Sequence, residues 1–188
     1  MTLANAFKVH RMTLDRWMDG SGRIHHGTRP TTGTAMPIAT HTFHDGEDPA
    51  DTHVAEKWWL ARGAMDAERE AMRTWCPTFT EVPGTADTPP TWIGSITTPK
   101  TTFKVAIKHR HDHGLPFVIP EVDDPRLRAK SPHRYTSGLL CVADEADWNP
   151  AEHTAAIVVG WAAHWYDAFV DFMFFRTWPI ETHVSSAA

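Results

Sequence analysis

Cysteine is scarce in this chain, with two among 188 residues. Two cysteines are too few for a disulfide framework, so a reducing cytoplasm is the expected compartment. Long hydrophobic runs are also missing: the longest apolar stretch, residues 155–163, falls far short of the ~20 residues that a membrane-spanning helix needs. The opening MTLANAFKVHRMTLDRW lacks the apolar core of a secretory signal. We therefore expect a soluble cytoplasmic protein with no membrane partner.

An excess of basic charge is absent as well, because the formal net charge is -5. This argues against non-specific nucleic-acid binding, which needs a clustered basic surface. What the chain does have is 41% hydrophobic residues, including nine tryptophans. This composition predicts one domain with a hydrophobic core large enough to fold without disulfide or metal cross-links.

The N-terminal part has a different texture from the rest. Residues 1–19 carry a mild helical pattern, whereas residues 20–52 are dominated by Gly, Thr, Pro and His and show little periodicity. We predict that residues 1–52 form an extension, partly helical and then irregular, ahead of a domain at 53–179. Residues 180–188 are expected to form a flexible tail.

The predicted domain reads as helix, three strands, long loop and helix. The run 56–75 favours a helix that is capped by Asp51 or Thr52 and ended by Pro77. Alternating segments at 90–97 and 101–110 predict a hairpin, and the proline-interrupted segment 115–122 suits a sheet edge or the last strand. A structureless run to residue 138 then precedes an apolar helix from Asn149 to Phe175. This order predicts an α+β fold, an antiparallel meander sheet with helices on one face.

One segment carries recognisable chemistry. SPHRYTSGLLC, followed by VADEADWNP, resembles the active-site segment of ubiquitin-conjugating enzymes, in which a His-Pro-Asn triplet precedes Gly-x-x-Cys and a Trp-x-Pro follows. Pro132 matches the triplet's proline, Gly138 the glycine, Cys141 the catalytic cysteine, and Trp148 the tryptophan. PFVIPEV at 116–122 resembles the family's Pro-x-x-Pro-x-Val element. The resemblance covers roughly residues 53–179.

The resemblance implies a ubiquitin-conjugating-like fold with an N-terminal helix, a meander sheet, an active-site loop and a long C-terminal helix. The triplet here reads Ser131-Pro132-His133, and that final histidine is similar to bacterial members from antiphage operons. For such members the resemblance implies a protein acyl donor with a C-terminal glycine, either a nucleotidyltransferase that makes cyclic oligonucleotides or a ubiquitin-like protein. It also implies an activating enzyme as a further partner, and no cofactor.

The residues themselves suit acyl transfer. A thiolate is a strong nucleophile, and a thioester stays reactive toward amines. The Pro-, Arg- and Lys-rich loop 123–140 predicts a partly exposed, electropositive surrounding for Cys141. His133 could donate a hydrogen bond to the oxyanion, or act as a base toward the incoming amine. Asp144, Glu145 and Asp147 could orient or deprotonate that amine.

Each of these interpretations has a plainer alternative. Cys141 could be a buried structural cysteine, which is the preferred interpretation of Cys76. His133 could serve only as a loop hydrogen-bonding residue, and Trp148 is expected to pack under the active-site loop. Among thirteen histidines, His109, His111 and His113 would share one side of a strand as zinc ligands. We favour a solvated loop there, and predict no metal.

Two functions of different classes follow. The first is an acyltransferase that accepts a partner's C-terminal glycyl group on Cys141 and passes it to an amine, in bacterial antiphage defence. The second is a non-catalytic module of the same fold that presents a ubiquitin-like protein or peptide.

Overall fold

The computed structural model describes residues 16–39, 41–43, 47–54, 56–128 and 131–179, and its main feature is a four-stranded antiparallel meander. The strands β4 (Thr80–Val82), β5 (Thr91–Thr97), β6 (Thr102–Lys108) and β7 (Phe117–Pro120) lie in that order. The three predicted strands and the short connection between β5 and β6 are confirmed, and β7 is one of the two edge strands, as its proline indicated. β4 was missed because three residues carry too little alternation to be recognised.

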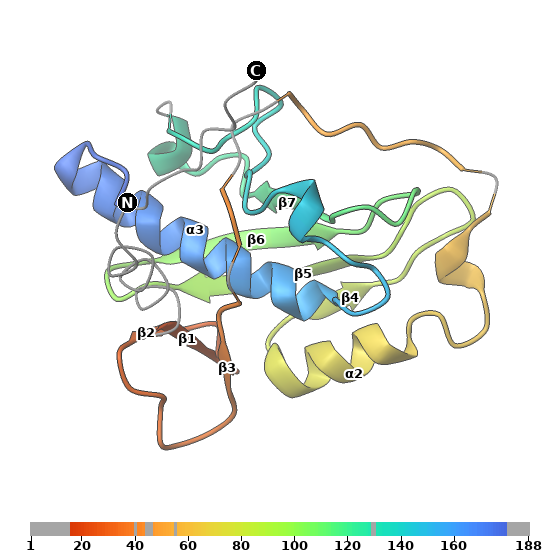
Figure 1. Cartoon of the computed structure of the whole chain (residues 1–188), viewed down its shortest axis with the longest axis horizontal. Coiled ribbons are helices and arrows are strands. Elements are labelled where there is room, and N and C mark those ends of the chain that lie inside the picture. The colour runs from red at the N-terminus through yellow and green to blue at the C-terminus, as the bar shows by residue number, and fades with distance from the viewer. Residues whose placement is uncertain (1–15, 40, 44–46, 55, 129–130, 180–188) are drawn as a thin grey trace, which may run out of the picture.

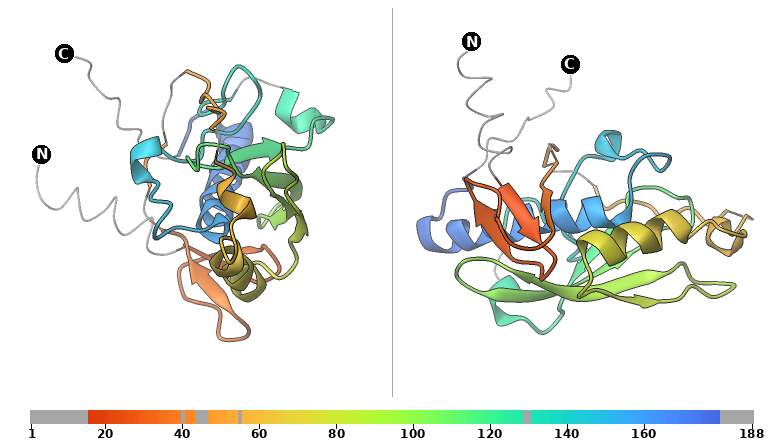
Figure 2. Two further views of the ribbon diagram at one scale, coloured as in Figure 1. Left: turned by 90° about the vertical axis from the view of Figure 1, so that its right-hand side faces the viewer. Right: turned by 90° about the horizontal axis from the view of Figure 1, so that it is seen from below.

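Two helices cover the same side of this sheet, as Figure 2 shows. They are α2 (Asp66–Trp75) and α3 (Ala155–Phe175), and α3 runs across β5 and β6 in Figure 1. The α+β class with an antiparallel sheet and a long C-terminal helix is therefore confirmed. No helix among the described residues is long and apolar enough to cross a membrane.

The helix predicted for 56–75 is wrong in its first half. A 3₁₀ turn, η1 (Trp58–Leu60), comes first, and Gly63 at φ 78° breaks the chain before α2 begins. A left-handed residue cannot continue a right-handed helix, so the predicted cap at Asp51 or Thr52 is also wrong. The helix ends at Trp75, ahead of Pro77 as predicted.

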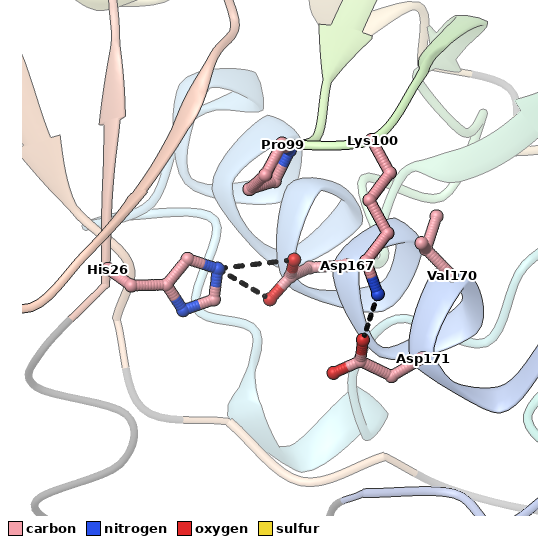
Figure 3. Close-up of a pocket in the computed structure, with 6 residues that line it drawn as sticks. All are labelled: His26, Pro99, Lys100, Asp167, Val170 and Asp171. Atoms are coloured by element: carbon pink, nitrogen blue, oxygen red, sulfur yellow. Dashed lines mark hydrogen bonds and ion pairs between the residues drawn. The ribbon is translucent and has the colours of Figure 1, made fainter. Parts of the chain in front are cut away.

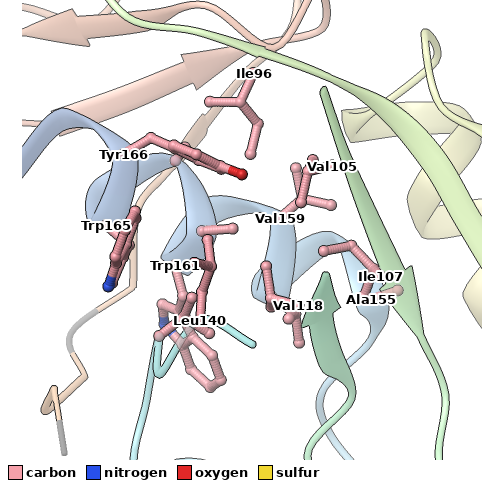
Figure 4. Packing of buried hydrophobic residues seen from close by; sticks show 14 of the residues in the cluster. Ile96, Val105, Ile107, Val118, Leu140, Ala155, Val159, Trp161, Trp165 and Tyr166 are labelled. Carbon is pink, nitrogen blue, oxygen red and sulfur yellow. The ribbon is translucent and has the colours of Figure 1, made fainter. Parts of the chain in front are cut away.

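The C-terminal helix begins later than its sequence suggested. Residues 149–152 form turns, Thr154 is the N-cap, and α3 starts at Ala155. Its predicted end at Phe175 is confirmed, where Arg176 adopts a left-handed conformation. Figure 4 shows how the face of α3 toward the sheet packs. The buried side chains labelled there come from β5, β6, β7, the segment after η2 and α3: Ile96, Val105, Ile107, Val118, Leu140, Ala155, Val159, Trp161, Trp165 and Tyr166.

The described part of the N-terminal region is not helical. β1 (Arg16–Asp19), β2 (Ile24–His26) and β3 (Ala35–Pro37) form a second antiparallel sheet in the order β2-β1-β3. The predicted helix over 1–19 is thus wrong at residues 16–19, and residues 1–15 lie outside the described part. Met18, Ile24 and Met36 join the same core cluster as α3. The domain boundary at residue 52 stays a prediction, and residues 180–188 lie outside the described part.

Candidate functional site

Cys141 closes a short hairpin beside β7. Arg134 pairs with Leu140 across the hairpin, and Leu140 also pairs with Val118 of β7. The Cys141 amide donates a hydrogen bond of 2.9 Å to the His133 carbonyl. The run 123–138, predicted as structureless, therefore contains ordered structure: one arm of this hairpin and the 3₁₀ turn η2 (Pro125–Arg128). Backbone pairing to the main sheet fixes the position of the cysteine.

Gly138 makes the turn of this hairpin possible. Its φ is 92°, a conformation that L side chains rarely adopt, and its amide donates to the Tyr135 carbonyl at 3.0 Å. The guanidinium of Arg134 donates to the Gly138 carbonyl at 3.2 Å. The glycine that the motif singled out thus has a backbone role.

Cys141 is buried, with 2% of its surface exposed. The predicted partial exposure of the cysteine is therefore wrong, and the electropositive surrounding stays a prediction. The loop's Arg126 does not leave a positive charge unmatched, because its guanidinium is paired with Asp124 (Nε–Oδ1 2.8 Å). Lys130 and the side chain of Arg128 lie outside the described residues.

His133 is buried as well, and its ring packs against two aromatic side chains. Phe43 stacks on it at 5.3 Å between ring centroids, and Trp178 lies at 5.0 Å. Its φ of 55° is uncommon for a residue with a side chain. Its carbonyl accepts hydrogen bonds from the Cys141 amide and from Trp165 Nε1, the latter at 2.8 Å. The backbone of His133 therefore joins the cysteine to α3.

The acidic residues after the cysteine are engaged in local structure. Asp144 caps the 3₁₀ turn η3 (Glu145–Asp147), accepting from the Ala146 amide at 2.9 Å. Asp147 accepts from the Thr42 amide at 2.7 Å, and Glu145 pairs with Arg110. These contacts shape the turn that follows Cys141.

Trp148 and Pro132 also lie beside the hairpin in sequence. The Trp148 indole donates to the His113 carbonyl at 3.1 Å, so it fastens η3 to the turn after β6 rather than to the hairpin itself. Pro132 is half-buried next to Ser131, whose hydroxyl is buried without a hydrogen-bond partner among the described residues.

The predicted N-terminal extension reaches this site. Asp48 accepts hydrogen bonds from the Thr136 hydroxyl and from the Ser137 hydroxyl, the latter at 2.8 Å. These bonds hold the pKa of Asp48 below its usual value. Phe43 packs on the His133 ring, so the extension contacts the hairpin segment at two points.

Tyr135 is the site residue that sequence reasoning missed. Its hydroxyl is hydrogen-bonded to the Cys141 side chain. Burial and that contact raise the pKa of Tyr135, with the nearby Glu145 and Asp144 adding to the shift. The signal was present, because residues 135 and 141 flank a predictable Gly138 turn, but only the register of the hairpin brings them together.

The histidines after β6 do not form a solvated loop, and that prediction is wrong. His109 and His111 are buried, and His113 stacks on Trp58 at 3.9 Å. Burial lowers the pKa of His109 to about 3, and raises that of the neighbouring Glu68 to about 7. Within the described ranges no group of three or more His, Cys, Asp or Glu side chains could hold a metal ion.

A pocket of about 220 Å³ opens between β2, the β5–β6 turn and α3. Figure 3 shows that its charged groups are already paired: His26 with Asp167 at 3.3 Å, and Lys100 with Asp171 at 3.0 Å. None of the predicted site residues lines it. This pocket offers no reactive group comparable with Cys141.

Comparison with known families gives one result. The model of the E2-CBASS family, described as type II CBASS E2 protein, matches residues 68–185, a range that contains Cys141 and the other predicted site residues. No curated protein and no solved structure matches the chain. Because the match spans more than half of the sequence, the chain belongs to the E2-CBASS family, the E2-like proteins of bacterial antiphage defence.

Proposed function

We propose that this protein is a conjugating enzyme that carries the C-terminal glycyl group of a partner protein as a thioester on Cys141. The observation that supports this is the position of Cys141, at the end of a hydrogen-bonded hairpin with Tyr135 against its side chain, inside the segment that the family model matches. The proposed acyl donor is a nucleotidyltransferase or a ubiquitin-like protein with a C-terminal glycine, activated by a separate enzyme.

The chemistry takes two balanced steps. In the first, the Cys141 thiolate attacks the carbonyl carbon of an activated glycyl thioester, a carbon–sulfur bond forms, and the activating enzyme's thiolate leaves. In the second, an amine attacks the new thioester, the Cys141 carbon–sulfur bond breaks with its electron pair returning to sulfur, and the amine loses a proton to solvent. The product is an amide, and the cysteine is regenerated.

The contacts of the neighbouring residues favour roles in shaping the site. The His133 ring packs against the rings of Phe43 and Trp178, which supports the loop-holding alternative over an oxyanion donor or a base. Asp144 and Asp147 accept backbone hydrogen bonds, which supports a role in forming η3 rather than in deprotonating an amine. Trp148 is proposed to fix η3 in place through His113.

The test is adduct formation when this protein is co-expressed with a nucleotidyltransferase or ubiquitin-like protein that ends in glycine and is encoded by a neighbouring gene. The native protein should yield a complex that thiols and hydroxylamine cleave. Cys141→Ser should yield a hydroxylamine-sensitive ester that thiols spare, and Cys141→Lys an amide that resists both. Cys76→Ala is the matched control and should keep the adduct. An adduct that persists in Cys141→Ala refutes the proposal.

The burial of Cys141 favours a second candidate, the non-catalytic binding module. A cysteine with 2% of its surface exposed can serve packing alone. Under this alternative the two buried cysteines should be equally slow toward iodoacetamide, and a partner should still be captured by Cys141→Ala, without any covalent adduct.

A further inference from the structure

The side chains of Tyr135 and Cys141 share one face of the hairpin. Arg134 and Leu140 are directly opposite each other, with the Tyr135 amide bonded to the Leu139 carbonyl and the Cys141 amide to the His133 carbonyl. Side chains alternate between faces along each arm, so residues 135 and 141 are diagonal neighbours on the same side. A tyrosine is long enough to reach across such a diagonal.

The phenol of Tyr135 keeps its proton in this position. Burial, the hydrogen bond with Cys141 and the nearby carboxylates of Glu145 and Asp144 all oppose its ionisation. A protonated phenol beside a sulfur atom is a hydrogen-bond donor, and a thiolate is a far better acceptor than a thiol.

A donor matters here because both cysteines are withdrawn from water. For Cys76, burial alone raises the thiol pKa to about 12, which leaves almost no thiolate near neutral pH. Cys141 is buried to the same extent. A thiolate in such a place needs a fixed donor in place of the water it has lost.

We propose that Tyr135 donates a hydrogen bond to the Cys141 sulfur, which stabilises the thiolate and aims it. The inference rests on the proposed function in that Cys141 is the nucleophile. During acyl transfer Tyr135 neither gains nor loses a proton. When the amine takes the acyl group, the carbon–sulfur bond breaks and its electron pair returns to the sulfur that faces the same donor, so Tyr135 also stabilises the leaving thiolate.

The experiment measures the thiol itself and needs no acyl donor, so its outcome is independent of whether the adduct test succeeds. In a Cys76→Ala background, the rate of iodoacetamide alkylation of Cys141 is followed from pH 6 to 11. Tyr135→Phe should raise the midpoint of this profile by ~1 pH unit, slowing the reaction at pH 7 by roughly 10-fold.

Tyr166→Phe is the matched control. It removes the other tyrosine hydroxyl, which is buried without a hydrogen-bond partner among the described residues, and keeps the stacking of its ring on Phe103 at 4.3 Å. Its alkylation profile should superimpose on that of the parent. A Tyr135→Phe profile that is unshifted, or a Tyr166→Phe profile that shifts equally, overturns the proposal.

A second measurement serves if Tyr135→Phe fails to fold. In the Tyr166→Phe protein Tyr135 is the one tyrosine left, so incorporation of 3-fluorotyrosine alters that phenol alone. Fluorination makes the phenol a stronger donor, and the midpoint should fall by a few tenths of a pH unit, to an extent set by the hydrogen bond. An unchanged midpoint overturns the proposal here too.

Discussion

The two cysteines are equally buried but differ in the groups that surround their sulfur atoms. Cys76 ends α2 within the apolar core, where burial raises its pKa to about 12, and Glu68 at the start of the same helix and its neighbour His109 are likewise shifted toward their neutral forms. Cys141 ends a hairpin in which Tyr135 contacts its sulfur and Asp48 and Asp144 hold the adjoining turns. Equal burial therefore does not imply equal reactivity; what differs is the supply of hydrogen-bond donors.

The contrast should appear most strongly in competitive alkylation of the native protein. A thiol with a pKa of about 12 is ionised at a level near 10⁻⁴ at pH 8, so Cys141 should react roughly 10²–10³-fold faster than Cys76. Peptide mass spectrometry after a short iodoacetamide pulse measures this ratio. A ratio near one would contradict the proposed difference and favour the binding module.

The α2 region can be tested through the pH dependence of stability. Burial raises the folded-state pKa of Glu68 to about 7, above its unfolded value. The stability that Glu68 contributes is therefore fully present below about pH 4.5 and is lost as the pH rises through 7. Glu68→Gln removes this loss while keeping an acceptor for the Ala155 amide. The difference in unfolding free energy between the variant and the native protein should therefore rise by about 2 kcal/mol in favour of the variant when the pH goes from 5 to 8. Urea denaturation at each pH measures this difference.

The exposed Glu70 on the same helix supplies the control, because Glu70→Gln should leave that pH dependence unchanged.

His109 has the opposite pH dependence, because burial lowers its pKa to about 3. The stability that His109 contributes is fully present above pH 6.5 and is lost as the pH falls toward 3.

Packing should distinguish the cysteines as well. Cys76 is a member of the hydrophobic core cluster, so Cys76→Ala leaves a small void and should cost about 1–2 kcal/mol of unfolding free energy. The measurement is again urea denaturation, at pH 7 under reducing conditions. A loss below about 0.5 kcal/mol would indicate that the core closes around the missing sulfur.

The smallest effect is expected from the clasp that Asp48 forms on the hairpin. Reagent access to the buried Cys141 requires local opening, and Asp48 stabilises the closed form through Thr136 and Ser137. Asp48→Ala should therefore speed Cys141 alkylation by roughly 2–5-fold. Glu47→Ala is the neighbouring control, and an equal acceleration in that variant would remove Asp48 from the explanation.

Part of this structure could be predicted from the sequence because it depends on local patterns. Alternation placed β5 and β6, and Pro120 placed β7 at the sheet edge. Composition could not show that Gly63 takes a left-handed conformation and divides an otherwise helical run, since glycine is tolerated in both states. The strands β1 to β3 were not predicted because each is three or four residues long, which is too short to show an alternating pattern.

By itself the sequence determined the position of the cysteine: Pro132, Gly138, Cys141 and Trp148 occur at the spacing of a known active-site segment, and the family match agrees with it. Only the tertiary structure decided the environment of that cysteine. It buried the thiol, packed the His133 ring against two aromatic side chains, and brought Tyr135 onto the sulfur. The physical reason is that spacing fixes the order of residues along the chain, whereas burial and hydrogen-bond partners depend on segments far apart in sequence, such as Phe43 and Trp165, meeting around the hairpin.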